Sequence, residues 1–125
     1  MCFVIDRSSP EPLIADSDIV CYKEGTLMHI DDGRPVFVSL FQGYIYRFQE
    51  RQPELTLRPD RKGSRYISKG YHSYHPRNSI LQSFTHECSS RVLVKCIIPK
   101  GSMYYYTPYY QEYVSSCLIV LGVEY

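Results

Sequence analysis

Three of the four histidines and one cysteine lie close together in the sequence, at His72, His75, His86 and Cys88. Nitrogen and sulfur ligands of these types bind zinc in a tetrahedron. The spacing matches no standard zinc finger or ribbon, however, and His75 precedes a proline, where the chain is expected to turn. We therefore interpret these residues as surface histidines and a buried thiol, and we expect neither a metal nor a cofactor.

The segment from Pro99 to Ser102 has the composition of a phosphate-binding loop. Lys100 would supply a positive charge, and Gly101 and Ser102 would supply backbone and hydroxyl donors. The same residues are typical of a turn at the end of a strand, because proline stops the hydrogen-bond ladder and glycine reverses the chain. We favour the turn. A turn can also bind a ligand, so Lys100 and Ser102 are kept as candidates for contact with one.

Catalytic motifs are missing from the sequence. Cysteine, histidine and carboxylate side chains coexist, but their presence alone does not predict nucleophilic catalysis. The chain has no G-x-S-x-G elbow, no P-loop and no G-x-G-x-x-G motif. A function without catalysis is therefore favoured, and no catalytic residue is assigned.

Tyrosine is concentrated near the C-terminus, where six of the thirteen tyrosines fall between Tyr104 and Tyr113. Tyrosine rings stack and their hydroxyl groups form hydrogen bonds, which suits a base, a sugar or the surface of a partner. In a strand, alternation would direct about half of the rings into the core. Tyr109, Tyr110 and Tyr113 follow Pro108 and are predicted to lie in a loop, so they are the better candidates for recognition.

Length and charge restrict the class of protein. The chain has 125 residues, the size of one domain, and a formal net charge of +1, which gives no strong signal for nucleic acid. Basic residues gather between Arg58 and Lys69, where we expect a solvated loop.

The five cysteines are irregularly spaced, which fits a reducing compartment. The N-terminus lacks a signal-peptide pattern and the longest apolar run is too short to cross a bilayer, so we predict a cytoplasmic protein without membrane contact.

The residues above must be positioned mainly by β-strands. Apolar or alternating stretches predict strands at 19–23, 28–30, 36–42 and 44–49, followed by an extended segment over 65–74 that Gly70 interrupts. Residues 24–26 predict a turn that joins the first two strands as a hairpin. Two apolar strands in the last third of the chain flank the tyrosine-rich stretch.

Only one segment carries a helical pattern, with Pro76 near its start and Ile80, Leu81 and Phe84 on one face. Residues 1–18 predict an irregular N-terminal arm, and residues 59–64 predict a mobile loop. The predicted fold is mainly β, or α+β with little α. It is a single compact domain over residues 1–125, with a mixed or antiparallel sheet and one short helix near residues 76–84.

Four motifs resemble a group of short proteins from gut anaerobes and their phages. They are Cys21-Tyr22-Lys23, Gly70-Tyr71-His72-Ser73-Tyr74, the stretch from Lys95 to Ser102, and Tyr113-Val114-Ser115-Ser116. The motifs are spread over about residues 19–120, although residues 24–65 carry none of them. The resemblance implies a phage or prophage accessory protein, and it implies no catalytic residue.

The chain is also similar to ADP-ribosyltransferase-like domains. Those domains pair an early strand bearing Arg or His, a middle strand with an aromatic-x-Ser motif, and a late strand that opens with Glu. Tyr71-His72-Ser73 matches the second element and Glu112 the third, whereas Tyr22-Lys23 stands where Arg or His belongs. The similarity implies an enzyme that acts on NAD and depends on Glu112.

The leading hypothesis is a non-enzymatic binding protein, a phage or prophage accessory factor that binds a host protein or sequesters a nucleotide-like small molecule in the host cytoplasm. The predicted site comprises Tyr71, His72, Ser73, Lys100, Ser102, Tyr109, Tyr110, Glu112 and Tyr113. The tyrosine-rich loop is its centre, with His72 and Lys100 nearby. Two alternatives are an ADP-ribosyltransferase-like enzyme and a structural or assembly protein of a virion, which would form a defined homo-oligomer.

Overall fold

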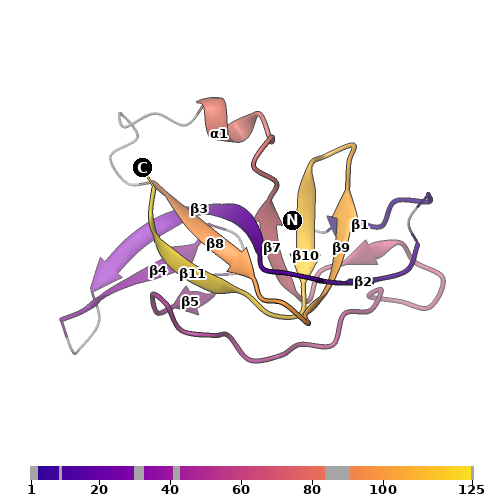
Figure 1. The fold of residues 1–125 in the computed structure, drawn as a ribbon, viewed down its shortest axis with the longest axis horizontal. Helices are drawn as coiled ribbons and strands as arrows, with labels where there is room; N and C mark the ends of the chain where they lie inside the picture. The colour runs from indigo at the N-terminus through magenta and orange to yellow at the C-terminus, as the bar shows by residue number, and fades with distance from the viewer. Residues whose placement is uncertain (1–2, 9, 30–32, 41–42, 84–90, 125) are drawn as a thin grey trace.

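The fold, seen in a computed structural model that describes residues 3–8, 10–29, 33–40, 43–83 and 91–124, is mainly β (Figure 1). The longest strand, β3 (Ile19–His29), has 11 residues. The other strands are β1 (Phe3–Val4), β2 (Leu13–Ile14), β4 (Pro35–Ser39), β5 (Ile45–Tyr46), β6 (Tyr66–Ile67), β7 (Tyr71–Tyr74), β8 (Val92–Ile98), β9 (Met103–Thr107), β10 (Glu112–Ser115) and β11 (Ile119–Val123). Every pairing between these strands is antiparallel, which confirms the predicted fold class.

One large sheet has the strand order β11-β8-β3-β7-β10-β9-β2, and β4 and β5 attach beside β3. Along one edge β3 pairs with β8, and along the other it pairs first with β7 and then with β4. Figure 1 shows β3 passing from the β7, β10 and β9 group to the β4, β5, β8 and β11 group. A second, small sheet consists of β1 and β6.

The predicted turn at residues 24–26 is wrong, because β3 continues through these residues. Gly25 pairs with β8 on one side and with β4 on the other. A Cβ atom at this position would lie 2.1 Å from the carbonyl oxygen of Val38 and 2.8 Å from the ring of Phe37. Glycine is therefore needed at this position because β4 lies very close to β3, and the chain does not turn here.

The helix α1 (Ile80–Ser83) is shorter than the predicted segment near 76–84. Residues before it form a turn instead, in which the Asn78 N–H donates to the His75 carbonyl oxygen at 2.9 Å. The Asn78 side chain then accepts a hydrogen bond from the Ile80 N–H at 3.0 Å, as a helix-capping residue does. Phe84 lies outside the described residues. No described helix has the length and apolar character that crossing a membrane requires.

Two predicted segments have more structure than the sequence indicates. The N-terminal arm, residues 1–18, contributes β1 and β2, which pair with β6 and β9. Residues 59–64 include a turn in which the Ser64 N–H donates to the Arg61 carbonyl oxygen at 2.9 Å. Gly70 does interrupt the extended segment as predicted, and its φ of 152° suits glycine.

The hydrophobic core has two parts, one on each side of the β7–β10–β9 sheet. The larger part comprises Ala15, Cys21, Phe37, Tyr46, Tyr71, Val94, Cys96, Ile98, Tyr113, Leu118 and Val120. The smaller part comprises Phe3, Ile5, Leu57, Ile67, Tyr105 and Val114, and it fills the space between the two sheets. Tyr113 and Val114 are neighbours in β10, so alternation directs them to opposite faces.

Candidate functional site

Two exposed tyrosines stand at the turn between β9 and β10. Tyr109 is 83% exposed and Tyr110 is 52% exposed. Their ring centroids are 4.7 Å apart and the rings are nearly perpendicular, at 85°. This edge-to-face arrangement is a favourable one for two aromatic rings. We call Tyr109 and Tyr110 the tyrosine tip.

Hydrogen bonds from the segment after β7 hold the backbone of the tyrosine tip. The Asn78 side-chain amide donates to the carbonyl oxygens of Tyr110 and Gln111, at 2.9 and 3.1 Å. The His75 N–H donates to the Gln111 carbonyl oxygen at 2.9 Å. Gln111 has a φ of 52°, in the left-handed region, which closes the turn. The tip is therefore ordered by contacts within the chain, which lowers the entropy lost when a partner binds.

Tyr113 does not belong to this exposed group, and the prediction that it lies in the loop is wrong. It is the second residue of β10 and only 8% exposed. Its ring centroid lies 5.0 Å from that of Tyr106, 5.9 Å from that of Tyr104 and 5.8 Å from that of His75. Burial raises the pKa of Tyr113 to about 12. Tyr113 is therefore part of the larger core.

The turn containing Lys100 and Ser102 joins β8 to β9, at the opposite end of β9 from the tyrosine tip. The prediction that Lys100 lies near the tip is therefore wrong. The Lys100 N–H donates to the Asp18 carboxylate at 2.9 Å, and the Gly101 N–H donates to the Ala15 carbonyl oxygen at 2.9 Å. Ser102 is 1% exposed. The backbone donors that a phosphate cradle would need are already engaged, so the geometry supports a structural turn.

The aromatic-x-Ser motif and Glu112 lie on neighbouring strands, β7 and β10, but on opposite faces. Ser73 is paired with Tyr113, and Tyr74 with Glu112. Because side chains alternate along a strand, Ser73 faces the larger core with Tyr71, whereas Glu112 faces the other side. The structure thus does not bring Ser73 and Glu112 together.

Glu112 belongs to a small polar group around Tyr74. Burial raises the pKa of the half-buried Glu112. The Tyr74 hydroxyl donates to the buried Glu24 carboxylate at 3.3 Å, and the Arg91 guanidinium lies 3.8 Å from the same carboxylate. Desolvation and the two neighbouring carboxylates raise the pKa of Tyr74 above its usual value. The Tyr74 phenol therefore stays protonated at neutral pH and joins β7 to β3 through its hydrogen bond to Glu24.

His72 and His75 face opposite sides of the sheet. His72 Nε2 lies 3.0 Å from the Ser68 carbonyl oxygen, whereas the His75 ring stacks on Tyr113. His86 and Cys88, the other two members of the predicted cluster, lie outside the described residues. Within the described part of the chain, no three His, Cys, Asp or Glu side chains are grouped as a metal site requires.

Burial lowers the pKa of His72 to about 4, from a usual value of 6.5. Between these two pH values the unfolded chain binds a proton that the folded chain does not, so stability should fall as the pH falls. From pH 7.5 to pH 5 we expect a loss of about 2 kcal/mol in the free energy of unfolding, measured in urea. In a His72→Gln variant, whose amide can still donate to the Ser68 carbonyl oxygen, the loss should be much smaller. An equal loss in both proteins would contradict this origin.

Lys23 is a buried polar residue whose role the sequence does not reveal. It is 8% exposed and lies in β3 beside Cys21 and Cys96, which face each other across β3 and β8. Its ammonium group donates to the His72 carbonyl oxygen and lies 5.7 Å from the centre of the Tyr46 ring. Burial lowers the pKa of Lys23 to about 8. The only sequence signal is that Lys23 closes the predicted strand 19–23, whose other four residues are Ile, Val, Cys and Tyr.

The hydroxyl oxygen of Tyr46, which is 0% exposed, has no hydrogen-bond partner among the described residues. The Ser73 hydroxyl, on a residue 4% exposed, lies close enough to the Cys21 thiol to lower its pKa. Unsatisfied buried hydroxyls are costly and uncommon. The larger core is therefore more polar than its apolar strand sequences suggest.

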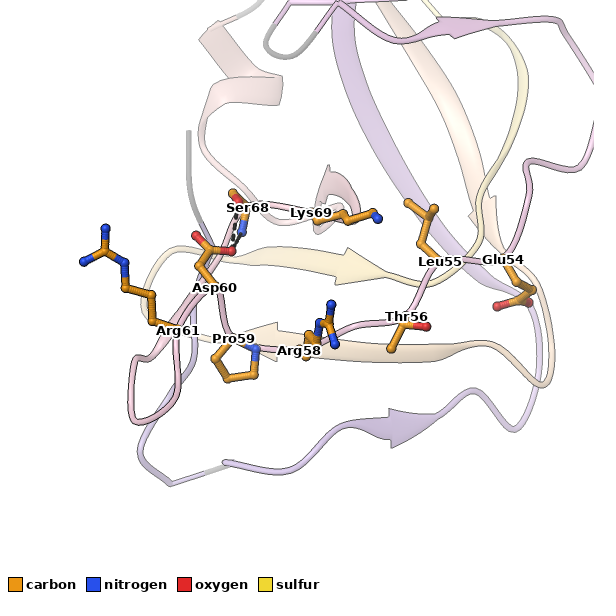
Figure 2. A pocket seen from close by; sticks show the side chains of 9 residues that line it. All are labelled: Glu54, Leu55, Thr56, Arg58, Pro59, Asp60, Arg61, Ser68 and Lys69. Carbon is orange, nitrogen blue, oxygen red and sulfur yellow. Dashed lines mark hydrogen bonds between the residues drawn. The ribbon is translucent and has the colours of Figure 1, made fainter.

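The basic cluster between Arg58 and Lys69, predicted to be a solvated loop, borders a pocket of about 660 Å³ (Figure 2). One wall is the segment 54–61, and the other is Ser68 and Lys69, just before β7. The sequence shows the basic residues but not the pocket, because the pocket needs the two segments to fold against each other. None of the nine predicted site residues lines it.

Comparisons with protein families, with curated proteins and with solved structures found no match to this chain. Within the described residues, the tyrosine tip and the pocket of Figure 2 are exposed features with a chemistry suited to binding.

Proposed function

We propose that this chain is a non-enzymatic binding protein and that it contacts a protein partner through the tyrosine tip. The observation that carries the proposal is the exposure of two adjacent rings, 83% for Tyr109 and 52% for Tyr110, on a backbone fixed by Asn78 and His75. Large exposed rings on an ordered turn are typical of interaction surfaces, since tyrosine has few rotatable bonds and a polar end.

The shape of the tip favours a protein partner over a small molecule. The turn between β9 and β10 projects beyond the ends of its strands (Figure 1). Small molecules bind in concave sites that cover most of their surface, whereas projecting rings insert into hollows on another protein. The resemblance to short phage proteins further supports a host protein in the cytoplasm as the partner.

Replacing Tyr109 and Tyr110 with alanine should leave stability within about 0.5 kcal/mol of the original, because exposed side chains contribute little to folding. The same double variant should lose binding to the partner. Thermal unfolding measures the first effect. The partner is detected with a photo-reactive phenylalanine analogue at position 109, cross-linked in a bacterial host cell as a band of defined mass. Adding Tyr110→Ala to this protein removes the second ring and measures the loss of binding.

The matched control places the photo-reactive residue at position 45 in β5, where Ile45 is also well exposed, at 59%. A band that forms only from position 109 and disappears with Tyr110→Ala supports the proposal. A band of the same mass from position 45, persistence after Tyr110→Ala, or no discrete band from position 109 would each contradict it. Unfolding of the double variant would show that the tip is structural.

A further inference from the structure

We propose that the pocket of Figure 2 binds the phosphate group of a small phosphorylated molecule, separately from the tyrosine tip. The pocket is formed by two segments that carry opposing cations, Arg58 on one and Lys69 on the other. Its volume of about 660 Å³ is within the range of small-molecule sites, roughly 300–1,000 Å³.

Asp60 holds the two walls of the pocket together. Its carboxylate accepts hydrogen bonds from the Ser68 N–H and the Ser68 hydroxyl, both at 2.8 Å (Figure 2). Its own N–H donates to the Tyr66 carbonyl oxygen at 2.8 Å. The hydrogen bonds from Ser68 lower the pKa of Asp60, so the carboxylate is ionised at neutral pH. The spacing between the walls is thus set before a ligand arrives.

The charges around the pocket leave an excess of positive charge in it. Asp60 is engaged by Ser68, and the Glu54 carboxylate lies 3.4 Å from the Arg51 guanidinium. No ion pair is formed by Arg58 or Lys69 within the described part of the chain. Three cations line the pocket, Arg58, Arg61 and Lys69, and Arg61 lies close enough to Asp60 to lower the pKa of that carboxyl. With Glu54 facing Arg51 and Asp60 facing Arg61, an anion entering the pocket would meet the positive charges of Arg58 and Lys69.

The side chains also define the kind of anion. The planar guanidinium of Arg58 matches two oxygens of a phosphate, and the ammonium of Lys69 supplies a mobile point charge. Thr56 adds a hydroxyl, and the half-buried Leu55 offers an apolar surface to the carbon part of the ligand. A phosphate ester of nucleotide size combines these features. A nucleic-acid backbone fits less well, because the overall charge is only +1.

The test is titration of the purified protein with ADP, followed by amide NMR spectra and calorimetry. We expect shifts confined to residues 54–61 and 66–70, competition by inorganic phosphate, and no binding of adenosine, which lacks the phosphates. Absence of shifts at about 5 mM ADP, above the range of weak specific ligands, would overturn the proposal. Equal binding of adenosine, or shifts located elsewhere, would overturn it as well.

Variants give a second readout. Arg58→Gln combined with Lys69→Gln should weaken ADP binding at least about tenfold, because both charged hydrogen bonds to the phosphate are lost. The matched control, Arg77→Gln with Lys100→Gln, removes the same charge from exposed residues that do not line the pocket and should leave the affinity unchanged. Equal weakening in both double variants would show general attraction between charges and would overturn a specific site. Both variants replace exposed side chains, and thermal unfolding verifies that they stay folded.

Discussion

Replacing Gly25 with alanine is expected to lower the free energy of unfolding by about 3–5 kcal/mol, a large part of the stability of a domain this size. The new methyl group would lie 2.1 Å from a backbone carbonyl oxygen, that of Val38, which cannot rotate away as a side chain can. The ring of Phe37, in the larger core, would also be displaced. Urea unfolding followed by circular dichroism measures the effect.

Gly122 provides the matched control, because it lies in β11 of the same sheet and a Cβ atom there would have no neighbour within 4 Å. Gly122→Ala should leave stability unchanged or raise it by up to about 1 kcal/mol, since glycine is unfavourable in a strand. Similar losses for the two variants would mean that the contact between β3 and β4 is not the cause. A Gly25→Ala protein as stable as the original would contradict the close approach itself.

Replacing Lys23 with methionine is expected to stabilise the protein by about 2–3 kcal/mol at pH 7. Burial lowers the pKa of Lys23 from 10.5 to about 8, so keeping the ammonium charged in the core weakens the folded state. Methionine has a similar length and no charge, and its thioether packs well beside aromatic rings such as Tyr46. The His72 carbonyl oxygen loses its donor, which offsets part of the gain.

The sign of the pH dependence separates this cause from better packing. Between pH 8 and 10.5 the unfolded chain holds a proton on Lys23 that the folded chain has released, so the original protein gains stability as the pH rises. The advantage of Lys23→Met should therefore shrink from pH 7.5 to pH 10. The tyrosines act in the opposite direction above pH 10, because burial raises the pKa of Tyr71 and Tyr113 to about 12, but they affect both proteins alike.

Lys95→Met is the control for this second prediction. Lys95 pairs with Tyr22 across β8 and β3, so it lies on the opposite face from Lys23 and is not fully buried. Its replacement should change stability by less than about 0.5 kcal/mol. A constant advantage of Lys23→Met at all pH values, or a loss of stability, would contradict the burial of a charged amine.

Local patterns in the sequence predict local features of the fold. Alternation of apolar residues predicts a mainly β structure, and Gly70, predicted to interrupt the extended segment over 65–74, has a φ of 152°. Gly25 shows the limit of this reasoning. Glycine supports both a turn and a close contact between strands, and only the position of β4 distinguishes them.

The candidate site is harder to predict, because its parts come together through long-range pairing. Tyr109 and Tyr110 follow a proline and are exposed, whereas Tyr113 lies outside the loop because β10 begins at Glu112, directly after the turn. The pocket requires Asp60 to reach Ser68, a contact that no local pattern encodes. The burial of Lys23 is evident only in the folded structure, where residues of β5, β7 and β8 lie around its side chain.

The position of β3 has a consequence for how the chain acquires this structure. Its partners are β4, β7 and β8, and β8 comes from the last third of the described chain. During synthesis β3 leaves the ribosome long before β8, and one of its edges stays unpaired until then. Contacts between distant segments form slowly because a long loop must close first. The nascent chain therefore has an exposed strand edge for most of its synthesis, which makes it a target for chaperones and for aggregation before the sheet is complete.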